Sequence, residues 1–329
     1  MIVEALAEFL TVSELGGVII NGLAKSALYV MIASGLTLIF GLMGVLNFAH
    51  GSLTMVGAYL GGLLLVVTVT SGTAPVTRLG LFFVAIVVVF ALLTVLGGAL
   101  ETTIIRPLYD RPPIYQILLT FGLTLVIEEI VRIVLSIYDL QPLSDWQAAL
   151  ATKPQLLREP VALGPISVGW MALFQILLGM ITVIGIWAFL TKTRYGLYIR
   201  AGSEDTEMAS ALGIDVRQVF TVVFALGIGL AGAAGTLLMW DPTWGASVPL
   251  AAETLLPAFI VVIVGGLGTF RGTVVAALVV GMADAVTTWW FQNVIEFTGL
   301  PELVLFLVLV VTLIVRPQGL FGVEEVGGH

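Results

Sequence analysis

Residues 79–100 read LGLFFVAIVVVFALLTVLGGAL, a stretch without a charged side chain inside an apolar block that runs from about residue 79 to 105. A bilayer core needs about 20 consecutive apolar residues for one helical crossing, so this block is predicted to span a membrane. Further apolar blocks lie on both sides of it, at residues 16–70, 114–138, 168–190, 219–240, 253–267, 274–291 and 303–315. The sequence therefore predicts an all-α polytopic membrane protein with eight or nine transmembrane helices, some of them broken.

The composition excludes a soluble protein. Of 329 residues, 59% are hydrophobic and only 10% are charged, whereas soluble domains carry about 25% charged residues. The chain contains no cysteine, which excludes a disulfide scaffold and a cysteine-based metal or redox site. Its net charge of −8 does not suit a basic nucleic-acid binder.

The chain divides into one long apolar domain with short polar ends. The first apolar block is preceded by three acidic residues and no Lys or Arg, unlike the basic start of a secretory signal. Residues 1–15 are therefore predicted to form an interfacial helix, residues 16–322 a single transmembrane domain, and residues 323–329 a tail. The block at 16–70 suits two long crossings or three short ones, and the sequence leaves that choice open.

Basic residues predict the orientation, because they concentrate in cytoplasmic loops. If the charged loop at 191–217 is cytoplasmic and the crossings alternate, eight basic residues lie inside: Arg106, Arg111, Lys192, Arg194, Arg200, Arg217, Arg271 and Arg316. Three lie outside: Arg78, Lys153 and Arg158. The loop at 191–217 and the C-terminal tail are therefore predicted to be cytoplasmic, and the polar stretch at 139–168 extracytoplasmic. The side of the N-terminus depends on the number of crossings in the first block.

Two interruptions lie inside apolar sequence. The first, Asn47-Phe48-Ala49-His50-Gly51-Ser52, places three polar side chains in the first block. The second runs from Gly265 to Gly272 and includes Gly266 and Gly268. Interrupted helices in corresponding halves are expected of a transporter whose substrate path they line. The alternatives are a cytosolic turn for the first interruption and close helix packing for the glycines.

Few ionisable residues lie within or near the apolar blocks; they are Lys25, Glu101, Glu128, Glu129, Arg132 and Asp284. Glu128 and Arg132 are four residues apart and are predicted to neutralise each other, whereas Lys25 can extend toward the membrane surface. Only Asp284 is an isolated acid, and a proton relay normally needs several. Ion coupling is therefore the weaker hypothesis, and no role is predicted for Asp284.

The sequence lacks the motifs of soluble enzymes. It has two histidines and contains neither HExxH nor Gly-x-Ser-x-Gly. A nucleotide-binding Walker A loop needs a glycine before its lysine, but the three lysines of this chain follow Ala or Thr. We therefore expect a transport protein with no catalytic residues, metal site, cofactor or nucleotide-binding site of its own.

A short helix is predicted in the cytoplasmic loop, over residues 203–213. Ser203 is a good N-cap, Glu204 and Asp205 suit the positive end of the helix dipole, and Gly213 stands where a C′ glycine belongs. A small apolar face is formed by Met208, Ala211 and Leu212. Because a two-turn helix is unstable alone, we expect it to dock onto a partner, with a solvated connector as the alternative.

Several of these motifs resemble one family. The pattern Glu204…Met208-Ala209…Gly213 resembles the EAA-type coupling loop of ABC permeases. More specifically, the chain resembles the LivH-type branch of the branched-chain amino-acid permeases, for which Asn-Phe-Ala-His-Gly at residues 47–51 is the most specific block. Further blocks that carry the resemblance lie at residues 35–41, 45–46, 201–214, 264–272 and 316–322, so it covers nearly the whole chain.

The resemblance implies an ABC importer permease fold with an inverted internal repeat, located in the cell membrane. The chain would work with a LivM-like second permease subunit, two ABC ATPase subunits and an extracytoplasmic substrate-binding protein. Together they would import branched-chain or related small amino acids. Urea or short-amide ABC importers share nearly the same motifs and stay open, and an ion-coupled secondary transporter stays open more weakly.

The candidate residues fall into two sets. The substrate path is predicted to include Asn47, Phe48, His50, Gly51, Ser52, Gly265, Gly266 and Gly268. Coupling to the ATPase is predicted to use Ser203, Glu204, Asp205, Met208, Ala209, Leu212 and Gly213.

Overall fold

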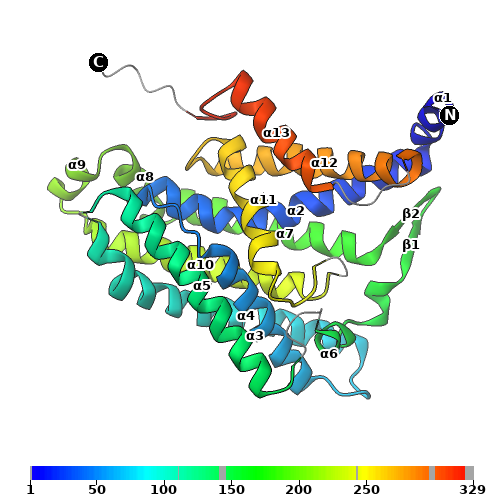
Figure 1. Cartoon of the computed structure of the whole chain (residues 1–329), viewed down its shortest axis with the longest axis horizontal. Coiled ribbons are helices and arrows are strands. Elements are labelled where there is room, and N and C mark those ends of the chain that lie inside the picture. Colours follow the sequence, from blue (N-terminus) through cyan, green and yellow to red (C-terminus); the bar gives the residue numbers. More distant parts are fainter. Residues whose placement is uncertain (1, 110, 141–145, 242–243, 296–300, 323–329) are drawn as a thin grey trace. The chain divides into compact units, whose positions relative to one another are not determined.

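The computed structural model describes residues 2–109, 111–140, 146–241, 244–295 and 301–322, and nearly all of their regular structure is helical (Figure 1). Contacts between Cα atoms group the chain into two compact units. Unit 1 comprises Met1–Val30, Gln155–Val183 and Phe259–His329, and unit 2 comprises Met31–Pro154 and Ile184–Ala258. Three helices contribute to both units: α2 (Val12–Met43), α7 (Trp170–Lys192) and α11 (Leu250–Gly265). The predicted tail at 323–329 lies outside the described residues.

Unit 1 also contains α1 (Ile2–Phe9), η3 (Gln155–Arg158), β1 (Pro160–Leu163), β2 (Ile166–Gly169), α12 (Phe270–Trp290), η4 (Phe291–Ile295) and α13 (Pro301–Val315). Small residues let its helices approach closely. A Cβ atom added to Gly281 of α12 would overlap Ser26 of α2, and one added to Gly179 of α7 would lie 2.5 Å from the Cβ of Ala27. The predicted helix over residues 1–15 is divided, because α1 ends at Phe9 and residues 12–15 already belong to α2.

Two short strands in unit 1 were not predicted. β1 and β2 pair antiparallel, with Pro160 opposite Gly169 and Leu163 opposite Ile166. Gly164 has a φ of +67° in the two-residue turn between them, a conformation that glycine adopts without strain. Four-residue strands are too short to produce a clear alternating pattern, and the prolines near them favour a loop. The regular secondary structure of the described residues is therefore helical except for one small hairpin.

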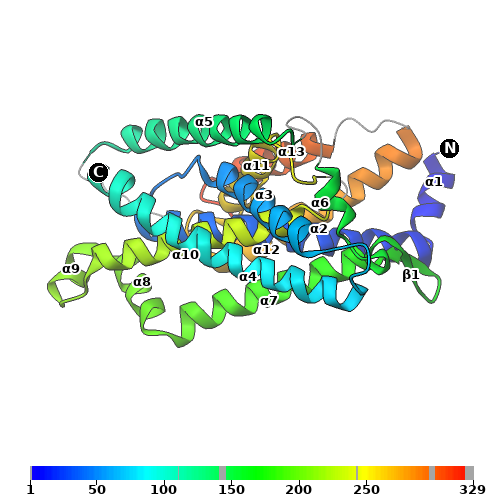
Figure 2. The ribbon, with the colours of Figure 1, turned by 90° about the horizontal axis from the view of Figure 1, so that it is seen from below.

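Unit 2 contains α3 (His50–Thr68), α4 (Pro75–Leu100), η1 (Glu101–Ile105), η2 (Arg106–Leu108), α5 (Pro113–Ile137), α6 (Gln147–Ala151), α8 (Arg194–Glu204), α9 (Thr206–Ala211) and α10 (Val216–Leu238). Its central helix is α10, which packs against α3 and α4 (Figure 2). A Cβ atom on Gly57 of α3 would overlap the backbone of Gly232 in α10. Glycine therefore sets the distance between these two helices.

In the part of the chain that the structure describes, six helices are long and apolar enough to cross a membrane: Val12–Met43, His50–Thr68, Pro75–Leu108, Trp170–Lys192, Val216–Leu238 and Phe270–Ile295. Two shorter apolar helices lie at Leu250–Gly265 and Leu303–Val315. The first apolar block forms two long helices, α2 and α3, rather than three short ones. The helical membrane fold is confirmed with six candidate spans, while the count of eight or nine crossings stays a prediction.

Exposed apolar side chains show which surfaces suit lipid. On α4, Val84, Val87 and Val95 are 58%, 65% and 74% exposed. Similar exposed residues continue on α5 and α7, for example Ile130 and Ile184. A soluble protein rarely exposes so many large apolar side chains along its helices, whereas a bilayer covers them without cost.

Candidate substrate path and coupling site

The first interruption is a buried segment between α2 and α3. Helix α2 ends at Met43, residues 44–49 are not helical, and α3 begins at His50. The side chains of Asn47, His50 and Ser52 are 1%, 0% and 0% exposed. An exposed cytosolic turn, the alternative interpretation, does not fit this burial.

The interruption lies beside the middle of α10. A Cβ atom on Gly35 of α2 would overlap the carbonyl oxygen of Gly227 and lie 2.9 Å from Cε1 of His50. Gly227 is the central residue of α10, about 17 Å along the helix from Val216 at 1.5 Å per residue. His50 therefore starts α3 at the mid-height of a candidate span. A polar break at this depth must be enclosed by protein or line a water-filled path.

Hydrogen bonds satisfy only two of the five side-chain polar atoms of Asn47, His50 and Ser52. The backbone N–H of Ala49 donates to Oδ1 of Asn47 at 3.1 Å, and Nε2 of His50 lies 2.9 Å from the carbonyl oxygen of Ile32. Nδ2 of Asn47, Nδ1 of His50 and Oγ of Ser52 are buried and have no hydrogen-bond partner among the described residues. Buried polar atoms without partners are rare and indicate a bound water, a ligand or another functional role.

The neighbouring glycine of this segment has a packing role. A Cβ atom on Gly51 would overlap the carbonyl oxygen of Ala251 and approach Leu255 at 2.9 Å, so glycine lets α11 begin against the start of α3. Phe48 is partly buried. The part of these residues in a substrate path stays a prediction.

The second interruption is a packed glycine turn between α11 and α12. Gly266 and Gly268 have φ values of +98° and +82°, which favour glycine. The C-terminal residues complete the turn, because the N–H groups of Leu320 and Phe321 donate to the carbonyl oxygens of Val264 and Gly265 at 2.8 and 3.0 Å. This geometry gives the glycines a packing role, and a place for Gly265, Gly266 and Gly268 in a substrate path stays a prediction.

The predicted coupling helix is two helices, α8 and α9. The predicted N-cap is wrong: Ser203 lies inside α8 and its Oγ donates to the carbonyl oxygen of Arg200 at 2.9 Å. Asp205 is the cap, since its extended backbone ends α8 and its Oδ1 accepts from Met208 N–H at 2.8 Å. Glu204 is consequently the last residue of α8 rather than part of the first turn of α9.

The predicted role of Gly213 as the C′ residue that ends the helix is confirmed for α9. Gly213 has a φ of +86°, and the N–H of Ile214 donates to the carbonyl oxygen of Ala209 at 3.1 Å, as in a Schellman motif. Ala209 is buried, whereas Met208 and Leu212 are 57% and 76% exposed. Two large apolar side chains therefore extend from α9 into solvent, as expected of a docking element.

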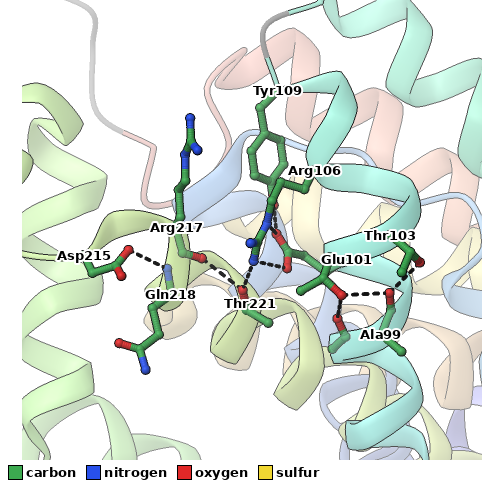
Figure 3. Close-up of polar contacts among 11 residues, drawn as sticks. Ala99, Glu101, Thr103, Arg106, Tyr109, Asp215, Arg217, Gln218 and Thr221 are labelled. Atoms are coloured by element: carbon green, nitrogen blue, oxygen red, sulfur yellow. Dashed lines mark hydrogen bonds and ion pairs between the residues drawn. The ribbon is translucent and has the colours of Figure 1, made fainter.

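A groove runs beside α9, between the end of α4 and the start of α10, and Figure 3 shows Arg106, Tyr109 and Arg217 from its lining. Its volume is about 860 Å³, and it is lined by Thr102, Arg106, Pro107, Tyr109, Thr206, Glu207, Ser210, Ala211, Val216, Arg217 and Phe220. Behind it, Glu101 is fully buried and accepts hydrogen bonds from Arg106 Nη2 at 2.9 Å and Tyr109 OH at 2.5 Å. Arg106 also donates to Thr221 of α10 at 2.6 Å, which ties the end of α4 to α10.

Sequence reasoning missed this network. Glu101 lies near the end of the apolar block at 79–105, and Arg106 follows five residues later, a spacing that the π-helical turn η1 brings together. An α-helix pairs residues three or four apart, so the spacing did not indicate an ion pair. Burial, followed by the Glu101 hydrogen bond, raises the pKa of Tyr109 far above its ordinary value, so the phenol remains a donor.

A second buried network lies in unit 1 and corrects the description of Asp284 as an isolated acid. Asp284 is 4% exposed, and its Oδ1 lies 2.7 Å from Lys25 Nζ. Its Oδ2 accepts from Tyr29 OH at 2.7 Å, and Thr288 donates to Oδ1 at 3.0 Å. The partner was hidden because it lies 259 residues away in the sequence. The pairing of Glu128 with Arg132 is as predicted, at 3.9 Å.

Together these features define a multi-pass helical membrane protein with a buried polar break at the middle of a candidate span and a connection of two short helices, α8 and α9. The chain belongs to the family described as branched-chain amino acid transport system / permease component, whose model matches residues 18–315. It is a permease component of a branched-chain amino acid ABC transport system. It is thus a transport protein rather than an enzyme, as expected.

Individual relatives support the LivH-like assignment. The high-affinity branched-chain amino acid transport system permease protein BraD of Pseudomonas aeruginosa is 26% identical over 94% of this chain and 96% of its own length. The corresponding LivH of Escherichia coli is 26% identical over 93% of this chain and 95% of its own. One solved structure, PsaBC from Streptococcus pneumoniae in complex with Fab, aligns with 97% of this chain and 97% of its own. The sequence identity is 12% and the TM-score is 0.47.

Proposed function

We propose that this chain is the membrane subunit of an ATP-driven importer of branched-chain or related small amino acids in the cell membrane. The family match over residues 18–315 is the observation that carries the proposal. Urea or a short amide is the alternative cargo. An ion-coupled carrier is disfavoured, because Asp284, Glu101 and Glu128 each have a cationic partner in the structure.

The partners in this proposal are a LivM-like second permease, two ABC ATPase subunits and an extracytoplasmic substrate-binding protein. The absence of a Gly-Lys pair supports an external ATPase, because a Walker A loop needs one. The second permease is a different chain in our proposal, with a second copy of this chain as the alternative.

The proposed topology has nine crossings, formed by α2, α3, α4, α5, α7, α10, α11, α12 and α13. Two contacts support its sidedness, because they join predicted loops to opposite ends of α10. Arg106 bonds to Thr221 near the start of α10, and Lys153 Nζ donates to the carbonyl oxygen of Trp240, just past its end, at 3.1 Å. With residues 191–217 cytoplasmic and two crossings in the first block, the N-terminus lies outside. An inverted internal repeat within these crossings stays part of the proposal.

The proposed substrate path passes the interruption at Asn47–Ser52. Its burial beside the middle of α10 supports this role, because polar groups at that depth need an aqueous or protein-lined surrounding. In the same proposal, Gly265, Gly266 and Gly268 border the path through their backbone.

The proposed ATPase contact is α9 together with the groove beside it. The exposed side chains of Met208 and Leu212 support it, and the Arg106–Thr221 bond connects the groove to α10 and α4. ATPase closure would then move α4 and α10 together and open or close the path by tilting helices against the second permease.

The coupling proposal is tested with Met208→Glu/Leu212→Glu, because these exposed side chains do not support the fold of α9. We expect insertion and melting temperature to be unchanged and uptake to fall at least tenfold, because two charges replace the apolar contact. Enlarging Ala209 and Gly213 is less informative, since one is buried and the other has positive φ. A matched control is Gly72→Glu, in the open turn between α3 and α4. Full uptake by the double variant would exclude α9 as the contact.

The transport proposal is tested in proteoliposomes that contain the chain with its co-encoded partners. We expect labelled L-leucine to accumulate only with ATP and loaded binding protein, and a protonophore to leave the initial rate unchanged. Uptake that persists without ATP but collapses with the protonophore, or with Asp284→Asn, would establish a secondary carrier instead. Transport of urea but not leucine would identify the alternative cargo.

A further inference from the structure

The protonation of His50 follows from its hydrogen bond. The carbonyl oxygen of Ile32, 2.9 Å from Nε2, can only accept, so Nε2 carries the proton. A doubly protonated ring would add a buried N–H without an acceptor and a charge in a side chain that is 0% exposed, which is unfavourable. His50 is therefore neutral, and its Nδ1 is a buried lone pair without a donor among the described residues.

The amide orientation of Asn47 follows in the same way. The N–H of Ala49 donates to one end of the amide at 3.1 Å, which makes that end the oxygen. The other end, Nδ2, then holds two N–H donors without an acceptor in the part of the chain that the structure describes. Ser52 Oγ, in the first turn of α3, adds a third donor, a buried hydroxyl without a partner there. The segment therefore offers one acceptor and three donors.

We propose that Asn47, His50 and Ser52 form a neutral subsite for the charged ends of an amino acid zwitterion. The ammonium group donates to Nδ1 of His50, and the carboxylate accepts from Nδ2 of Asn47 and Oγ of Ser52. Val45, Ala49 and Leu53 belong to the buried apolar cluster around the same segment, so the surroundings of the subsite are apolar. The inference rests on the proposed function and specifies how this segment recognises its cargo.

A neutral subsite suits a transport path. Hydrogen bonds to charged groups are stronger than those between neutral groups, so the zwitterion regains part of its lost hydration. Without a fixed charge on the protein, the site does not hold either end of the cargo as an ion pair. Passage requires binding that is favourable enough to enter yet weak enough to leave.

Uptake by hydroxyl and amide variants tests the subsite. The assembled complex in proteoliposomes receives ATP and binding protein loaded with labelled L-leucine, and rates are normalised to assembled complex. We expect Ser52→Ala and Asn47→Leu each to lower uptake about tenfold or more, the usual effect of losing a hydrogen bond to a charged group. The matched control is Thr54→Val, which removes a buried hydroxyl of α3 that already bonds to the carbonyl oxygen of His50 at 3.0 Å. We expect this control to stay within about twofold of the unmodified complex.

Nitrogen NMR of His50 provides a readout besides transport. The chain has only two histidines, His50 and His329, so ¹⁵N-histidine incorporated into this chain alone, in a His329→Gln background and before assembly with unlabelled partners, reports on His50 alone. We expect Nε2 to be protonated and Nδ1 unprotonated in the assembled complex. L-Leucine delivered by the binding protein should move the Nδ1 resonance in at least one of two states of the complex, the nucleotide-free state and the ATP-bound state. The deaminated analogue 4-methylpentanoate should not, because it has no ammonium group.

The outcomes separate the subsite from the transport function. Wild-type uptake of leucine with unchanged rates in Ser52→Ala and Asn47→Leu would overturn the subsite, because ordered waters alone would then satisfy these atoms. An Nδ1 resonance that leucine moves in neither state, or a protonated Nδ1 in its absence, would also overturn it. A wild-type complex that takes up no leucine at all would overturn the proposed function itself.

Discussion

The two interruptions in the apolar sequence differ in how their polar groups are satisfied. At residues 265–272, glycines pack against backbone, and the N–H groups of Leu320 and Phe321 bind carbonyl oxygens of α11. At residues 47–52, three side-chain polar atoms are buried without a partner among the described residues. Interruptions of apolar sequence are therefore of two kinds, which differ in whether their polar groups have hydrogen-bond partners. A satisfied break supports the fold, whereas an unsatisfied break is available to a ligand.

The largest expected effect on stability is at the packed break. In Gly265→Val, the new Cβ would lie 2.6 Å from the carbonyl carbon of Gly272, which cannot rotate away. We expect a loss of about 3 kcal/mol, at the upper end of overpacking effects, measured as a lower melting temperature in detergent. The control is Gly17→Val, where nothing lies within 4 Å of the added Cβ. Equal stability of the two variants would remove the packing role of the turn.

The polar network around Asp284 is fully formed, so it can also be compared with the unsatisfied break at residues 47–52. Asp284→Asn leaves Lys25 without its charge partner, and we expect a loss of about 2 kcal/mol, reduced because Lys25 is 34% exposed. The double variant Lys25→Met/Asp284→Leu should recover most of that stability, since apolar replacement of an ion pair is often neutral. Thermal unfolding of the three proteins checks this. A stable single variant would show that the pair does not support the fold.

Tyr109 is expected to have a smaller effect. Tyr109→Phe removes one hydrogen bond to Glu101 and should cost about 1 kcal/mol. Because burial raises the pKa of Tyr109, its stabilising contribution is present at neutral pH and is lost as pH rises above the unfolded value of about 10. Unfolding curves across pH should therefore converge for the two proteins at alkaline pH. A stability advantage of the unmodified protein over Tyr109→Phe that grows above pH ~10 would contradict the raised pKa.

The smallest effect on stability is expected at the unsatisfied break. His50→Leu removes a buried atom without a partner, and Ile32 keeps its place in the α2 helix, so the change in unfolding free energy should be within about 1 kcal/mol. Uptake should nevertheless fall about tenfold or more. A large loss of stability in this variant would place His50 among the structural residues.

The sequence predicted what local pattern determines. Apolar block length predicted the spans, and Gly213 after a short helical pattern predicted the end of α9. The start of α9 was wrong because Ser203 and Asp205 are both good caps and only the backbone geometry distinguishes them.

Long-range partners could not be predicted. The pairing of Asp284 with Lys25 joins two ends of the chain, and the bond of Arg106 to Thr221 joins residues 115 apart. The family motif drew attention to residues 47–52, but it could not distinguish a buried break at mid-span from a turn. That distinction depends on the packing of Gly35 against Gly227 and His50.

Thiol labelling of Ser52→Cys tests whether Ser52 lies on the substrate path, because the natural chain has no cysteine and any label on it reports one position. The assembled complex in proteoliposomes is treated during ATP turnover with a small hydrophilic methanethiosulfonate, and the labelled fraction of this chain is measured by mass spectrometry. Gly72→Cys, in the open turn after α3, serves as the positive control. If Ser52 lies on the substrate path, Ser52→Cys is labelled during turnover and leucine-loaded binding protein slows the reaction. A cysteine at position 52 that never reacts during turnover, or that reacts at the same rate with and without leucine, would show that Ser52 does not lie on the substrate path.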